Sequence, residues 1–200
     1  MQLDTDLTGL TGSMLAILVL LARFPRVRVL PPLRRAGVLA AAVVVVSIPL
    51  WGLSLAGFVR GIAGDLSITT LVLLAMALLR AFHDRPLVEE RNRLGVLQAI
   101  AVAAVLFYPF ALGLGMFDPY RLGFGNLWFM VALLALAVWA SLRASMLLAV
   151  CIALAVAAWS VGWYESTNLW DYLLDPWLAI YAIAALAKHG LARWRSEKHA

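Results

Sequence analysis

Residues 127–163 read LWFMVALLALAVWASLRASMLLAVCIALAVAAWSVGW, two long apolar runs that are separated only by the turn SLRAS. Arg143, in that turn, is the one charged residue of the stretch. A membrane helix needs about 20 mostly apolar residues, because the hydrocarbon core of a bilayer is about 30 Å thick. The stretch therefore predicts two antiparallel membrane helices joined by a tight turn.

The composition of the whole chain agrees with this prediction. Of the 200 residues, 64% are hydrophobic and 14% are charged, and the mean hydropathy is +0.92. Soluble domains are about 45–50% apolar and about 25% charged. A chain of this composition cannot cover its surface with polar groups in water. The composition therefore excludes a soluble globular protein, a nucleic-acid-binding protein and a disordered tail.

Seven apolar segments are long enough to be membrane helices. We expect spans at residues 7–21, 36–57, 66–81, 94–114, 127–142, 145–163 and 176–191. The first segment is short, and partial insertion of this segment remains an alternative. The prediction is an all-α transmembrane bundle that forms one integral membrane domain over residues 1–200.

Basic residues are concentrated on one side of the expected spans. Fourteen of the 16 Lys and Arg residues fall in loops on that side, and the other side has only Arg60 and Arg121. Loops rich in Lys and Arg stay in the cytoplasm, so we expect the N-terminus outside and the C-terminus inside. Arginine also outnumbers lysine 14 to 2, a bias typical of GC-rich bacteria, so we expect a multi-pass protein of the bacterial inner membrane.

Two features of the expected spans concern packing. Pro49 and Pro109 lie in the outer parts of the second and fourth spans, where each would kink its helix. The two kinks would open a cavity toward the outer face, although proline is also tolerated in ordinary membrane packing. Small residues at every fourth position of the sixth span predict a ridge for close helix packing: Ser145, Ala149, Ala153 and Ala157.

The centres of the spans contain no ionisable residue, so candidate functional residues lie in the outer loops. Aromatic rings beside carboxylates, amides and arginine suit a glycan or a lipid headgroup, although aromatic residues also collect at membrane interfaces in general. We expect Arg121 to pair with Glu165 or Asp171. The candidate binding residues are Arg60, Asp65, Asp118, Arg121, Glu165, Asn168 and Asp171.

The predicted function is that of a non-catalytic accessory or scaffolding subunit of an envelope complex, with the bilayer and a membrane protein as its partners. The single cysteine, Cys151, excludes an internal disulfide, and we expect no cofactor and no metal site. One alternative is an enzyme or carrier for a lipid-linked or glycan substrate at the outer face. Another is an uncoupled small-molecule transporter whose path is lined by the second and fourth spans.

Overall fold

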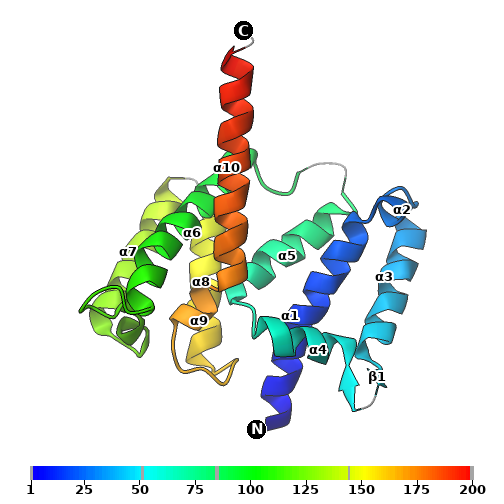
Figure 1. Ribbon diagram of the computed structural model, residues 1–200, viewed down its shortest axis with the longest axis horizontal. Helices are drawn as coiled ribbons and strands as arrows, with labels where there is room; N and C mark the ends of the chain where they lie inside the picture. The colour runs from blue at the N-terminus through cyan, green and yellow to red at the C-terminus, as the bar shows by residue number, and fades with distance from the viewer. Residues whose placement is uncertain (1, 51, 84–85, 144, 199–200) are drawn as a thin grey trace.

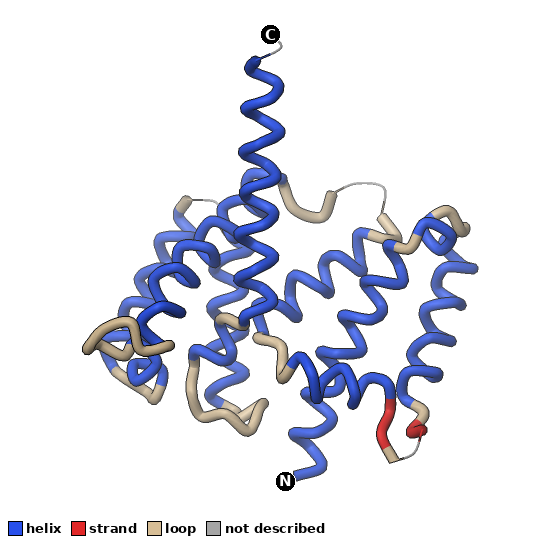
Figure 2. Tube along the Cα trace, viewed as in Figure 1, coloured by secondary structure: helices blue, strands red, loops and turns tan. Residues whose placement is uncertain are grey.

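The computed structural model describes residues 2–50, 52–83, 86–143 and 145–198, with side chains from Thr8 onward. These residues form an all-α fold with one very short hairpin (Figures 1 and 2), which confirms the all-α part of the prediction. The helices are α1 (Gln2–Arg23), α2 (Pro25–Arg28), α3 (Pro32–Ser47), α4 (Leu55–Ala63), α5 (Ile68–Arg80), α6 (Glu90–Ala111), α7 (Leu127–Leu142), α8 (Met146–Ser160), α9 (Trp170–Leu173) and α10 (Pro176–Lys198). The strands are β1 (Pro49–Leu50) and β2 (Leu53–Ser54), and a 3-10 helix, η1, covers Pro119–Gly123.

The long helices alternate in direction between two ends of the molecule (Figure 1). The α1–α3, α5–α6 and α7–α8 connections and the end of α10 lie at one end, which we call the basic end. The α3–α5, α6–α7 and α8–α10 connections lie at the other, which we call the acidic end. The N-terminus lies at the acidic end, and α10 projects from the body at the basic end (Figure 1).

Two groups of buried side chains hold the helices together. The larger core lies among α5, α6, α7, α8 and α10, with Val96, Leu97 and Cys151 almost fully buried at its centre. The smaller core joins α1 to α3 through Leu18 and Leu39. Helix α5 contacts both α1 and α8, so it connects the two groups.

Helix α6 is the one helix in the described ranges whose length and apolar composition together suit a membrane crossing. Four other apolar helical segments are shorter, at 10–17 residues: Thr8–Arg23, Ile68–Arg80, Leu127–Leu142 and Met146–Ser160. At about 1.5 Å per residue, a helix of 16 residues is about 24 Å long. Such a helix is shorter than the average hydrocarbon core.

The prediction of one continuous helix over residues 36–57 is wrong. Helix α3 ends at Ser47, and β1 then pairs with β2 in an antiparallel hairpin. Because proline disfavours a helical conformation in the residue before it, Ile48 is extended, with φ −68° and ψ 123°. Pro49 therefore ends the helix and does not kink it. Pro109, in contrast, lies inside α6 near its end, as expected.

The predicted packing ridge on α8 is also wrong for contacts within this chain. Ala153 and Ala157 are exposed, and Ser145 and Ala149 are only partly buried. The buried side of α8 carries larger residues beside one alanine: Leu147, Leu148, Cys151, Ile152 and Ala155. Spacing by four positions identified one face of the helix, but the neighbouring helices α5, α6 and α7 cover a different face.

This correction leads to a test with a matched pair of variants. Ala155 is fully buried, so Ala155→Leu should lower the free energy of unfolding by about 1–3 kcal/mol through overpacking. Ala153→Leu adds the same atoms on an exposed face and should change stability by less than about 0.5 kcal/mol. Thermal unfolding of the two purified variants measures the difference. Equal melting temperatures would contradict the assignment of the buried face.

Candidate functional site at the acidic end

Hydrogen bonds join the α6–α7 connection to the α8–α10 connection. The side chain of Asn168, which is 1% exposed, donates from Nδ2 to the carbonyl oxygen of Tyr120 at 2.9 Å. The indole Nε1 of Trp170 donates to the carbonyl oxygen of Pro119 at 3.0 Å. These bonds join residues about 50 positions apart in the sequence. They therefore fix the α6–α7 connection against the α8–α10 connection.

Close backbone contact and aromatic packing strengthen this junction. The amide of Leu169 donates to the carbonyl oxygen of Gly123 at 2.9 Å. A Cβ atom at Gly123 would overlap the side-chain amide of Asn168, so only glycine fits this contact. The ring of Trp170 lies 4.4 Å from that of Phe107 and 4.7 Å from that of Phe129, measured between centroids.

Asp171 is bound by two hydroxyl groups. The phenol of Tyr120 donates to its Oδ2 at 2.9 Å, and Ser166 Oγ donates to the same oxygen. Burial, followed by the hydrogen bond to this carboxylate, raises the pKa of Tyr120. Arg121 is exposed, and among the described residues no ion pair joins it to Asp171 or Glu165. The expected pairing of Arg121 with one of these carboxylates is therefore wrong.

Asp175 lies where two helices begin, and it is 5% exposed. Its Oδ1 accepts from the amide of Leu178 at 2.9 Å and so caps α10. Its Oδ2 accepts from the amide of Ser67 at 3.0 Å, from Ser67 Oγ at 2.7 Å and from Thr70 Oγ1. Ser67 in turn caps α5 by accepting from the amide of Thr70. One carboxylate thus stabilises the N-termini of both helices, where the helix dipole favours negative charge.

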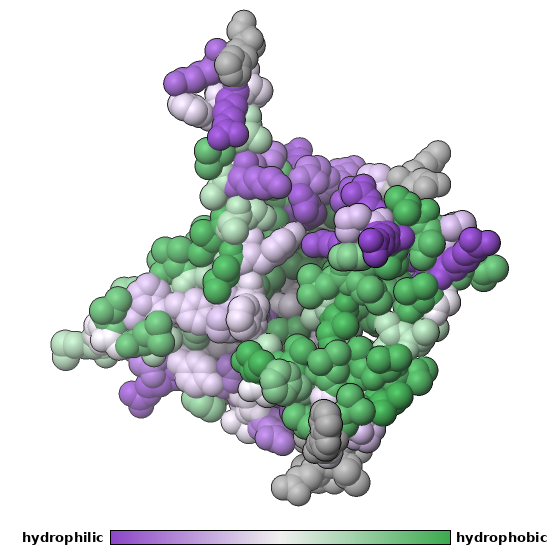
Figure 3. Space-filling model, turned by 45° about the vertical axis from the view of Figure 1, so that its right-hand side comes forward, coloured by the Kyte–Doolittle hydropathy of each residue, from purple (hydrophilic) through white to green (hydrophobic). Residues whose placement is uncertain are grey.

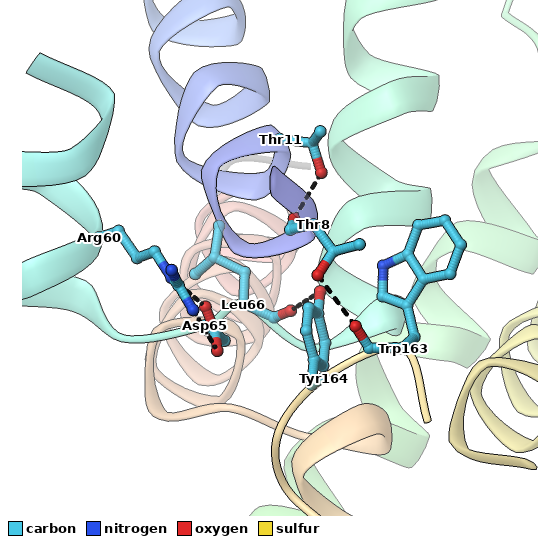
Figure 4. A network of polar contacts seen from close by, with 7 residues as sticks. All are labelled: Thr8, Thr11, Arg60, Asp65, Leu66, Trp163 and Tyr164. Carbon is cyan, nitrogen blue, oxygen red and sulfur yellow. Dashed lines mark hydrogen bonds and ion pairs between the residues drawn. The ribbon is translucent and has the colours of Figure 1, made fainter. Parts of the chain in front are cut away.

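Arg60 and Asp65 form an ion pair at 2.6 Å between Nε and Oδ1, beside the start of α5 (Figure 4). Helix α1 passes so close that a Cβ atom at Gly9 would overlap both side chains of the pair. A glycine-rich hollow of about 640 Å³ beside α4 is lined by both residues.

A second set of bonds connects α1 and the start of α5 to the loop that follows α8 (Figure 4). Thr8 Oγ1 donates to the carbonyl oxygen of Trp163 at 2.9 Å, and the phenol of Tyr164 donates to that of Leu66 at 2.7 Å. Burial raises the pKa of Tyr164, and the nearby negative charge of Asp65 raises it further. The acidic end is therefore one connected structure.

A cleft of about 510 Å³ lies between these connections. Its polar lining comprises four carboxylates, three phenols and one hydroxyl: Asp65, Asp118, Asp171, Asp175, Tyr108, Tyr120, Tyr164 and Ser166. Phe107, Ala111, Leu112, Leu174 and Pro176 complete the described lining, which includes no basic side chain. Among the described residues, no group of histidine, cysteine or acidic side chains could hold a metal ion.

The structure brings together some of the predicted binding residues. Asp65, Asp118 and Asp171 line the cleft. Asn168 binds the backbone of Tyr120, another lining residue, and Arg60 forms an ion pair with Asp65. Arg121 and Glu165 are exposed and lie outside its lining. Asp175 was not among the predicted binding residues, and its partners Ser67 and Thr70 lie more than 100 residues away in the sequence.

The role of Asp175 can be tested by removing one acceptor without changing the shape of the side chain. Asp175→Asn places an amide NH₂ group against one of the donors from Ser67, Thr70 or Leu178, and should cost about 2–3 kcal/mol of stability. Asp118→Asn is the control, because asparagine can still accept from the amide of Tyr120. Chemical denaturation should show a loss for the first variant only, and two equally stable variants would refute the assigned role.

Comparison with known proteins identified no relative of this chain. No protein-family model matches the sequence, and no similar protein was found among the curated sequences or the solved structures.

Proposed function

We propose that this protein crosses the bacterial inner membrane seven times, through α1, α3, α5, α6, α7, α8 and α10. Three observations support the proposal: the alternating helix directions, the separation of basic and acidic ends, and the apolar surface between them. Figure 3 shows hydrophilic residues along the upper edge above a broad hydrophobic surface. Apolar residues more than half exposed on these helices include Leu20, Val44, Val45, Val105, Leu106, Leu134 and Ile180. Soluble monomers rarely expose apolar surface on this scale.

The short helices are compatible with this proposal. Helices α5 and α10 begin inside the molecule and not at its lower edge (Figure 1). Non-helical backbone is tolerated at membrane depth where it is buried in protein or lines a water-filled cavity. The segments before these helices meet the first condition, because Ser67 and Asp175 are buried in the protein. A bilayer can also become locally thinner around short spans at modest cost.

Reporter fusions test the topology. A reporter that is active only in the cytoplasm should work after the C-terminus and fail in the connection that contains Tyr120, because the basic end stays inside. Activity only at Tyr120 would reverse the proposed orientation. If fusions at both chain termini are active, the first segment does not cross the membrane. Recovery of the protein from the aqueous fraction without detergent would exclude a membrane location.

The function that the geometry favours is a non-catalytic accessory or scaffolding subunit that presents a rigid surface at the outer face. One observation carries this proposal: each carboxylate lining the cleft is already bound by groups of the chain itself. Asp65 has an arginine, Asp118 a backbone amide, Asp171 two hydroxyls and Asp175 four donors. A general acid or base must be within reach of a substrate proton, and these bonds instead hold the loops together.

A glycan-binding role is the second candidate, favoured by the lining of the cleft. Aromatic rings can pack against sugar rings, and carboxylates accept hydrogen bonds from hydroxyl groups. A phosphate headgroup would face four carboxylates in the described lining, with no basic side chain among them, so we favour an uncharged glycan over a phospholipid here. The transporter alternative has less support, because only Pro109, and not Pro49, lies within a helix.

Complementation of a deletion strain separates the accessory role from catalysis. Arg121→Ala and Glu165→Ala, at exposed positions on the acidic end, should each abolish function without changing abundance in the membrane. Asp118→Asn should complement fully, because it removes the ability to ionise but keeps the hydrogen bond to Tyr120. Loss of function in Asp118→Asn at normal abundance would instead favour an enzyme. Full complementation by the other two variants would exclude their side chains from the partner surface.

A further inference from the structure

The α1–α3 connection at the basic end, residues 23–35, contains five arginines and no acidic residue. One of them, Arg35, fixes the shape of the connection. Its Nη2 donates to the carbonyl oxygens of Arg28 at 2.6 Å and Leu30 at 3.0 Å, and its Nη1 donates to that of Ala81 at the end of α5. The positive charge of Arg35 is thus used to bind helix ends, where carbonyl groups favour cations.

The other four arginines, Arg23, Arg26, Arg28 and Arg34, have exposed side chains. No acidic side chain among the described residues forms an ion pair with any of them. Four like charges within twelve residues repel one another unless an anion lies nearby. The fold therefore holds these charges together without neutralising them.

Exposed apolar side chains lie between these arginines in the sequence. Phe24 is 54% exposed, Val29 80% and Leu33 86%, whereas Val27 is turned into the protein. The apolar surface continues onto α1 through Leu20, which is 70% exposed. A surface that combines basic and apolar side chains is typical of segments that lie at the interface of an anionic membrane.

We infer that this connection binds the headgroups of anionic phospholipids in the inner leaflet. The inference rests on the proposed membrane location. The guanidinium groups match the phosphate oxygens, which arginine can bind with two parallel hydrogen bonds. Phe24, Val29 and Leu33 lie against the adjoining acyl chains. These apolar residues favour a lipid over a free phosphate. A soluble anion would contact only the guanidinium groups and leave the apolar side chains exposed to water.

Native mass spectrometry of the full-length protein in neutral detergent tests the inference. Phosphatidylglycerol should bind about tenfold more tightly than phosphatidylcholine with the same acyl chains, and the difference should shrink at high salt. The triple variant R26Q/R28Q/R34Q removes three of the four exposed guanidinium groups, so it should lose most of this tenfold preference for phosphatidylglycerol. The control K188Q/R195Q/K198Q removes the same charge from exposed positions on α10 and should bind within about twofold of the unmodified protein.

Three results would overturn the inference. They are equal affinity for the two lipids, equal losses in the two triple variants, and full competition by glycerophosphate, which would indicate a site for a free anion. Each of these leaves the membrane location intact, because the protein still requires detergent. A protein that stays soluble without detergent would overturn the membrane location first, so the two failures are distinguishable.

Discussion

The carboxylate of Asp175 is the interaction on which the arrangement of the acidic end depends. Helices α5 and α10 both begin next to buried residues, Ser67 and Asp175, so their first amide groups need hydrogen-bond partners from the chain. An unsatisfied amide or hydroxyl in such a place costs about 1–3 kcal/mol. Asp175 binds donors from both helices, and Ser67 completes the cap of α5. Two helices that are distant in the sequence can therefore begin side by side within the bundle.

The rest of the acidic end is built in the same way, by polar side chains that bind backbone groups of other segments. Asn168 and Trp170 hold the α6–α7 connection, and Tyr164 holds the segment before α5. Because these partners are far apart in the sequence, the bonds form only after the helices pack. They explain why the cleft has ordered walls although it is formed largely by loops. Asp65, Asp118 and Asp171, which the sequence suggested as binding residues, also have partners within the chain.

The two ends differ in how they use charge. At the acidic end the carboxylates of the cleft are bound by the chain itself, so their contribution is mainly to structure. At the basic end Arg35 is bound internally, but the other arginines of the same connection are exposed and lack acidic partners among the described residues. If the protein spans the membrane as proposed, this asymmetry favours a preformed surface on one side and an electrostatic contact with lipid on the other.

Several features followed from the sequence by itself. The apolar composition and the long apolar runs predicted helices, and the predicted segment 176–191 begins at the same residue as α10. Lys and Arg residues are concentrated in alternate connections, and this pattern requires no knowledge of packing. These features are local, because hydrophobicity, capping and loop charge depend on residues that are near one another in the chain.

The tertiary structure decided which residues meet. Alanine spacing on α8 did not identify its buried face, because that face depends on where α5, α6 and α7 lie. The apolar run over residues 36–57 did not reveal that α3 ends before Pro49, because a run of suitable hydrophobicity can contain a hairpin as well as a helix. The partners of Asp171 and Asp175 were likewise unpredictable, because Tyr120, Ser67 and Thr70 approach them only through the fold. Composition and local pattern thus determined the helical class and the distribution of charge, whereas long-range packing decided the geometry of the cleft.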